Sequence, residues 1–180
     1  DYKFLSNFLY EINYPLFKGI EKHKNYLTPK LAFRYSPNET KNTTNHDVIV
    51  NYDSVFGVDR VGRSDMVEGG PPSITLGIDY VKKKQTELDV AEYFRNEELK
   101  KLIENKLINE SIKKIQNNEE IFSWGIATSL RSEENVDLPT KSTLGQKSSD
   151  FFGKVDFNPS NFFGFNYNFN LDNNLKQLNY

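Results

Sequence analysis

The chain has 180 residues, a formal net charge of −2 at neutral pH and no cysteine. At this length one domain is expected, and the weak acidic charge gives no reason to expect nucleic acid or an anionic membrane surface as a partner. The absence of cysteine excludes thiol catalysis, disulfides and thiolate metal sites.

Aromatic residues are abundant, with 14 phenylalanines and 10 tyrosines, although 27% of the residues are charged. A soluble protein of this composition would have a thin core, but strands that face lipid on one side and water on the other are expected to look like this. No run approaches the roughly 20 consecutive apolar residues of a membrane-spanning helix, which argues against a helical membrane protein. The chain begins at Asp1 with no signal-peptide pattern, so we expect an internal piece of a longer protein.

Alternation of apolar and polar side chains predicts an all-β chain, folded as an antiparallel meander of about six long strands. The predicted strands cover residues 8–17, 26–36, 74–81, 86–94, 151–157 and 163–171. Pro29 would break a ladder hydrogen bond, so it is expected near the start of its strand or at a bulge. Residues 48–50 are a candidate for one more short strand, and residues 59–72 have no periodicity and are expected to form ordered coil.

Residues 97–117 change period. Their apolar side chains recur at steps of three and four residues, which predicts an amphipathic helix inserted in a loop. Asn96 suits the N-cap, and Lys113 and Lys114 lie where they complement the helix dipole. We expect this helix to pack on its neighbours, in preference to docking a partner or lying on a membrane. Residues 122–130 fit either a short strand or a packed loop.

The last predicted strand alternates most clearly. One side carries Phe163, Phe165, Tyr167 and Phe169, and the other carries Gly164, Asn166, Asn168 and Asn170. Asparagine has a poor strand propensity, so a row of asparagines indicates a wet interior face. We therefore expect Asn166, Asn168 and Asn170 to line a lumen.

The connections predict a topology. Short connections at 18–25, 82–85 and 158–161 alternate with long ones at 37–73 and 95–147. Outer-membrane barrels have short periplasmic turns and long extracellular loops, and six strands cannot close such a barrel. Residues 1–180 are therefore expected to form a partial transmembrane β-barrel domain, one sector of a larger barrel, with the helical insertion in its second long loop.

A resemblance to a known family points the same way. The segment YLTPKLAFRYSPN, residues 26–38, is followed by Val55-Phe56, Asp59-Arg60, Gly62, Asp65, the run Val67-Glu68-Gly69-Gly70, and Leu76-Gly77. In order and spacing these residues resemble the middle of the barrel of the LptD family, the lipopolysaccharide-assembly outer-membrane proteins formerly called organic solvent tolerance proteins. Segments 144–150 and 158–174 extend the resemblance, and the predicted helical insertion falls outside it.

The resemblance implies part of a Gram-negative outer-membrane barrel that inserts lipopolysaccharide into the outer leaflet. In that family, periplasmic bridge proteins deliver lipopolysaccharide to a β-jellyroll domain, and the lipid leaves sideways between the first and last strands of the barrel. A lipoprotein, LptE, plugs the barrel. The jellyroll and the lateral opening lie outside this chain.

The loop that carries most of the resemblance, called here the family-motif loop, contains Asp59, Arg60, Asp65, Glu68, Gly69 and Gly70. Its three carboxylates could hold a divalent cation, but salt bridges with Arg60 and Arg63 that fix the loop are the favoured interpretation. The two glycines predict a turn. The two histidines are isolated among polar residues, and no serine has a histidine placed for nucleophilic catalysis, so we predict no enzyme and no cofactor.

Two other interpretations remain open. Another outer-membrane barrel, such as a TonB-dependent transporter or a porin, would have a plug domain in its flanking sequence instead of a jellyroll. The other is a soluble β-sandwich that binds carbohydrate through exposed aromatic residues. In a sandwich Phe163, Phe165, Tyr167 and Phe169 would pack beneath a second protein layer, with the asparagine row on an open surface.

Overall fold

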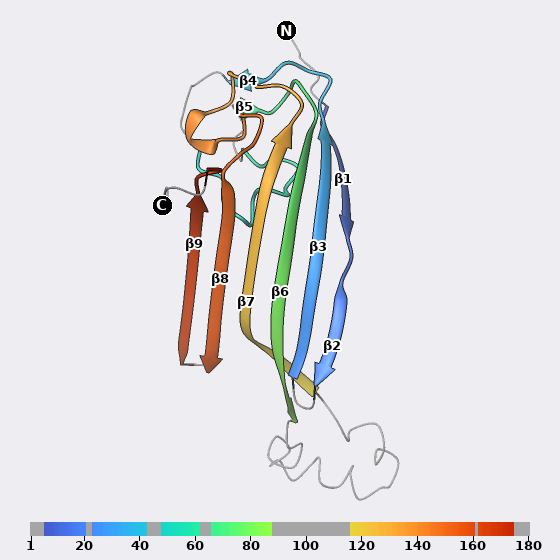
Figure 1. Cartoon of the computed structure of the whole chain (residues 1–180), viewed down its shortest axis with the longest axis vertical. Helices are drawn as coiled ribbons and strands as arrows, with labels where there is room; N and C mark the ends of the chain where they lie inside the picture. Colours follow the sequence, from blue (N-terminus) through green and yellow to red (C-terminus); the bar gives the residue numbers. More distant parts are fainter. Residues whose placement is uncertain are drawn as a thin grey trace, which may run out of the picture.

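The computed structural model describes residues 6–20, 23–42, 48–61, 66–87, 116–160 and 162–174. They form one antiparallel sheet of seven strands and a separate two-stranded ribbon (Figure 1). The predicted all-β, antiparallel class is confirmed. The described residues contain no α-helix, only the 3-10 turn η1 at Thr140–Ser142, and no helix among them has the length and apolar character needed to cross a membrane.

Neighbours in the sheet follow the order β1-β3-β6-β7-β8-β9, and β2 pairs with β3 beside β1. Its strands are β1 (Phe8–Asn13), β2 (Leu16–Ile20), β3 (His23–Tyr35), β6 (Ser73–Glu87), β7 (Gln116–Arg131), β8 (Phe151–Ser160) and β9 (Phe163–Leu171); the ribbon pairs β4 (Lys41–Asn42) with β5 (Met66–Val67). The described sheet is open, with β1 and β2 along one edge and β9 along the other.

β1 and β2 are one strand interrupted opposite Pro29, which lies in the middle of β3. Proline has no N–H to donate, and in a strand the N–H and C=O of one residue point to the same neighbour. The carbonyl of Pro29 accepts a hydrogen bond from the backbone N of Tyr14 at 3.1 Å, so its missing donor also faces the interruption. On the other side the pairing of Pro29 with Ile78 continues.

The fourth strand differs from the prediction. The expected turn at 82–85 is wrong, because β6 runs through it to Glu87 and pairs with β7 as far as Gln116. The segment KKKQ contains no glycine, proline or asparagine that would favour a turn. Residues 86–87 of the predicted strand 86–94 end β6, and residues 88–94 lie outside the described residues.

The fourth strand is instead β7, where the sequence indicated only a short strand or a packed loop at 122–130. The predicted helix at 97–117 lies outside the described residues except for its last two, which begin β7. The predicted long loop 95–147 is therefore divided by β7, and its second part becomes the connection 132–150 between β7 and β8.

The remaining boundaries are closer to the prediction. The strand expected at 163–171 coincides with β9. The turns expected at 18–25 and 158–161 are too long, because β2 and β3 leave only residues 21–22 between them and β8 continues to Ser160 after a register shift. The strand candidate at 48–50 is wrong, and the coil expected at 59–72 contains the two residues of β5.

The two ends of the sheet carry different connections. Loops 36–72 and 132–150 lie at one end, called here the long-loop end, and the β2–β3 and β8–β9 turns lie at the other, the short-turn end (Figure 1). β6 ends and β7 begins at the short-turn end as well. The predicted strict alternation of short and long connections is therefore wrong at this one hairpin.

The core lies between the two long loops, 36–72 and 132–150, and one face of the sheet. Its buried apolar residues are Val50, Tyr52, Val55, Val61, Met66, Ala127, Leu138, Leu144 and Phe152. The rings of Tyr52 and Phe56 rest on the sheet where it has no side chains: a Cβ at Gly125 would overlap the Tyr52 ring, and a Cβ at Gly77 would overlap the Phe56 ring. The two glycines thus make the recess into which the loop packs.

Candidate functional site

One face of the sheet is apolar across its strands. Residues paired in an antiparallel ladder point to the same side, so the register joins side chains of neighbouring strands into rows. We call this face the outer face; its apolar members include Phe8, Tyr10, Ile12, Leu16, Leu27, Pro29, Leu31, Phe33, Tyr35, Ile74, Leu76, Ile78, Tyr80, Phe122, Trp124, Ile126, Leu130, Phe151, Val155, Phe157, Phe163, Phe165, Tyr167, Phe169 and Leu171.

No other described segment covers the outer face. Phe163, Phe165 and Tyr167 are 57%, 51% and 43% exposed, and Leu76 in the middle of the sheet is 41% exposed. Soluble monomers rarely expose apolar patches this continuous, and such patches mark contact surfaces for another protein, a ligand or a membrane.

The outer side of β9 is aromatic from Phe163 to Phe169, whereas on the other strands the aromatic side chains lie near the two ends of the outer face. At the long-loop end they are Phe8, Tyr10, Phe33 and Tyr35, and toward the short-turn end they are Tyr80, Phe122, Trp124 and Phe157. Aliphatic residues such as Leu76 and Ile78 lie between them. The Tyr80 ring stacks on Trp124 with centroids 6.2 Å apart, and its hydroxyl donates to Asn25 Oδ1 at 2.8 Å, toward the short-turn end.

The opposite face, called here the inner face, is mainly polar. Its side chains include Lys30, Ala32, Arg34, Ser73, Thr75, Asp79, Ser123, Ala127, Ser129, Arg131, Phe152, Lys154, Asp156, Asn166, Asn168 and Asn170. Ion pairs cross it: Lys30 pairs with Asp79, and Lys154 Nζ lies 2.9 Å from Asp53 Oδ1 and 3.4 Å from Asp156 Oδ2. Asp79 also accepts a hydrogen bond from the Tyr52 hydroxyl, which ties the loop to this face.

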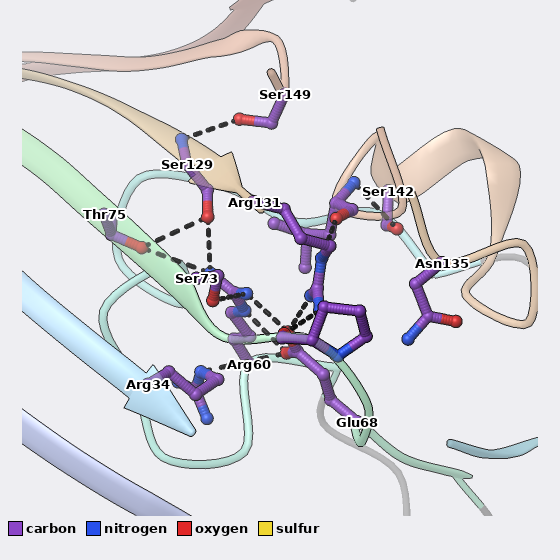
Figure 2. A network of polar contacts seen from close by, with 12 residues as sticks. Arg34, Arg60, Glu68, Ser73, Thr75, Ser129, Arg131, Asn135, Ser142 and Ser149 are labelled. Carbon is purple, nitrogen blue, oxygen red and sulfur yellow. Dashed lines mark hydrogen bonds and ion pairs between the residues drawn. The ribbon is translucent and has the colours of Figure 1, made fainter. Parts of the chain in front are cut away.

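A buried ion cluster lies at the long-loop end of the inner face (Figure 2). Glu68, from the family-motif loop, forms a two-pronged ion pair with Arg60: Nε donates to Oε2 at 2.6 Å and Nη2 donates to Oε1 at 2.5 Å. The other N–H groups of Arg60 donate to the hydroxyls of Thr75, Ser129 and Ser73 at 2.9–3.1 Å. Every N–H of this fully buried guanidinium therefore has an acceptor.

Two further arginines come from strand ends. Arg131, the last residue of β7, donates to Glu68, to the carbonyl of Pro71 at 2.7 Å and to the carbonyl of Leu144 at 3.1 Å. Arg34, near the end of β3, donates to the carbonyls of Gly57 and Val58, and its Nε lies 3.8 Å from Glu68 Oε2. One carboxylate thus joins β3, β7 and both long loops.

The neighbouring arginines stabilise the ionised form of Glu68. Burial by itself would raise the pKa of this carboxyl, but the hydrogen bonds and charge of Arg60, with the charges of Arg34 and Arg131, lower it to about 2. Glu68 is therefore ionised at all ordinary pH values. A buried charge of this kind is strongly destabilising once its partner is removed, so the cluster is a structural clamp.

The family-motif loop is only partly in this clamp. The expected salt bridge between Arg60 and an acidic residue is present, with Glu68 as the partner. Asp59 is exposed, and Asp65 and Arg63 lie outside the described residues. In the part of the chain that the structure describes, no group of three or more acidic or histidine side chains could hold a metal ion.

The two glycines of the motif form the expected turn. Gly70 has φ of +79°, and its N donates to the carbonyl of Asn38 at 2.7 Å. A Cβ at Gly69 would overlap the backbone of residues 38 and 39, so no larger residue fits there. Asn135, from the second long loop, donates to the carbonyl of Gly69 at 3.0 Å and fastens the two loops together.

The asparagine row of β9 lies on the inner face with different environments along it. Asn170 is buried, and its side chain donates to the carbonyl of Val50 at 3.1 Å. Asn166 and Asn168 are exposed, and Asn166 donates to Asp156. The row thus begins under the loop and continues beyond it toward the short-turn end.

Sequence reasoning missed Arg34, Arg131 and the hydroxyls around Arg60. The alternation in its strand places Arg34 on the polar side with Ala32, and this is the one sequence feature that points to its position. Arg131 follows a segment that was not identified as a long strand. Neither position by itself points to Glu68, because the contact depends on how the loops fold onto the sheet.

Comparison with known proteins finds no family model, no curated protein and no solved structure that matches this chain.

Proposed function

We propose that this chain is a sector of an outer-membrane β-barrel, and that the barrel is a lipopolysaccharide-assembly protein of the LptD kind. The observation that carries the first part is the outer face: an apolar surface, continuous across neighbouring strands, with no described segment over it. In this proposal hydrocarbon covers that face, and the inner face borders the lumen.

The dimensions and the chemistry of the strands support a membrane location. β8 and β9 have 10 and 9 residues, and a tilted transmembrane strand needs about 9–11. Aromatic girdles at the membrane interfaces with aliphatic residues between them are typical of such barrels. The outer face has aromatic residues at the long-loop end on β1 and β3 and toward the short-turn end on β6, β7 and β8, while the outer side of β9 is aromatic from Phe163 to Phe169. A β-sandwich would instead require a second protein layer on the outer face.

The LptD assignment is supported by what the family-motif residues do. Arg60 and Glu68 form the centre of the clamp, and Gly69 and Gly70 make the turn that brings Glu68 to it. These four residues of the resemblance thus hold the loop on the inner face, which borders the lumen in this proposal. On this proposal the partners are lipopolysaccharide, an LptE-like lipoprotein plug and the periplasmic bridge proteins. The barrel lies in the outer membrane of a Gram-negative bacterium, and its long-loop end is extracellular.

The membrane part of the proposal can be tested with Trp124, the one tryptophan of the chain, which lies on the outer face. The protein is refolded into phosphatidylcholine vesicles with brominated acyl chains. We expect strong quenching of Trp124 fluorescence, because bromine quenches only groups close to the acyl chains.

The matched control moves the reporter to the inner face, with Trp124→Phe combined with Asn168→Trp. This reporter should escape lipid quenching and respond to iodide in water. If iodide reaches Trp124 while brominated lipid does not, the outer face is not in hydrocarbon and the barrel proposal is wrong.

The transport part needs a separate test in the bacterium that carries the gene. Depleting the protein should leave newly made lipopolysaccharide inaccessible to surface labelling. If surface lipopolysaccharide is unchanged and uptake of a solute is lost, the protein is another outer-membrane transporter or porin.

A further inference from the structure

Two lysines lie on the outer face toward the short-turn end, one on β2 and one on β6. In the register Lys18 of β2 pairs with Asn25 of β3, and Asn25 pairs with Lys82 of β6. The three side chains form one row, adjacent to the row that holds Leu16, Leu27 and Tyr80. With a strand spacing of about 4.8 Å, the backbones of the two lysines are about 10 Å apart.

On β7, β8 and β9 this row continues with Phe122, Phe157 and Phe165. On β3 and β6 it lies where the outer face changes from apolar to polar. The hydroxyl of Tyr80 points from the apolar row into it and donates to Asn25, as a tyrosine at a membrane–water boundary is expected to do. Trp124 stacks beside Tyr80. Lysines at such a position extend along the apolar surface and place their ammonium groups at the level of the lipid headgroups.

Among the described residues, neither lysine has an acidic side chain within ion-pair distance. Lys84, one row further out, lies opposite Glu119 of β7 in the register, whereas Lys82 lies opposite Phe122. Lys18 and Lys82 are therefore lysines of the outer face that have no acidic residue opposite them in the register. The overall charge of the chain is slightly negative and conceals this local excess.

We propose that Lys18 and Lys82 form a site for the phosphate of an anionic phospholipid in the leaflet that borders the short-turn end. The inference rests on the proposed function, since it needs the outer face in hydrocarbon. It commits to a phospholipid because the short-turn end faces the periplasm in the proposed orientation, and lipopolysaccharide belongs to the opposite leaflet. Each lysine near a membrane surface attracts anionic lipid by up to about fivefold.

Trp124 can report the lipids at this site. The protein is reconstituted in vesicles that contain equal amounts of phosphatidylglycerol and phosphatidylcholine, with bromine on one lipid or on the other. We expect brominated phosphatidylglycerol to quench Trp124 more strongly, with a relative association constant of about five at low salt that falls toward one in 0.5 M salt.

The variant Lys18→Gln/Lys82→Gln should lose this preference. Its matched control is Lys24→Gln/Lys83→Gln, which removes two charges at the same end from the inner face, where Lys83 lies over the Tyr26 ring. The control should keep the preference. The lipid site is wrong if the relative association constant of the unmodified protein is one. It is also wrong if both variants lose the preference for phosphatidylglycerol equally.

Two further outcomes separate this inference from the proposed function. If neither brominated lipid quenches Trp124, the barrel proposal itself fails. If both quench equally, the barrel proposal stands and the phospholipid site is wrong. A last experiment adds purified lipopolysaccharide to the same vesicles, at a phosphate concentration equal to that of phosphatidylglycerol. If lipopolysaccharide displaces brominated phosphatidylglycerol from Trp124, the lysines bind the phosphates of lipopolysaccharide and the assignment to phospholipid is wrong.

Discussion

The outer and inner faces of the sheet use the same strands in opposite ways. On the outer face apolar side chains remain uncovered, while on the inner face a loop with its own core packs onto two glycines and a buried ion cluster. The inner face is therefore stabilised by specific contacts between distant residues, and the outer face depends on its surroundings. Substitutions on the inner face should act in any solvent, and those on the outer face only where lipid is present.

The largest effect is expected from removing the carboxylate of the clamp. Glu68→Ala leaves three buried guanidinium groups without their anion, and this should lower the free energy of unfolding by about 3–5 kcal/mol. Urea unfolding followed by Trp124 fluorescence measures the change. Asp59→Ala, an exposed acid in the same loop, should cost no more than about 0.5 kcal/mol. Equal effects of the two substitutions would contradict the clamp.

Acid should lower the free energy of unfolding by protonating the same residue, Glu68. The pKa of Glu68 is about 2 in the folded chain and 4.5 ordinarily. The carboxylate therefore stabilises the fold fully above about pH 5, and about 3 kcal/mol is lost as the pH falls from 5 to 2. Urea midpoints at several pH values measure this loss, and Glu68→Gln should lack that part of the pH dependence. If Glu68→Gln keeps the full pH dependence of stability, that dependence comes from other carboxyl groups.

The outer face should respond to depth in the membrane. Ile78 lies near the middle of the apolar rows and Phe8 near the long-loop end. Ile78→Arg should cost at least about 2 kcal/mol in vesicles, whereas Phe8→Arg should cost about 1 kcal/mol or less. Unfolding from vesicles measures both. Equal costs at the two depths would mean that hydrocarbon does not surround this face.

The smallest effect is expected from removing the hydrogen bond between β9 and loop 36–72. Asn170→Ala removes the hydrogen bond to the carbonyl of Val50 and should cost about 1 kcal/mol. Asn168→Ala, an exposed residue in the same row, should leave stability unchanged. If the two changes cost the same, the loop is not held by β9.

The sequence determined the all-β class, the two-sided character of residues 26–36 and 163–171, and the ion pair between Arg60 and an acid of its own loop. These features depend on alternation along one strand or on neighbours within a loop, and both are visible in one segment. Only the tertiary structure decided that residues 116–131 form a full strand, because β7 is defined by its pairing with β6 and β8.

Tertiary structure also decided which residues meet Glu68 and Val50. Arg131 lies 63 residues from Glu68, and Asn170 lies 120 residues from Val50. Contacts at that separation form only when the loops fold onto the inner face, and no local pattern encodes them. The physical reason is that side-chain alternation specifies a face, while the partner on that face is chosen by packing.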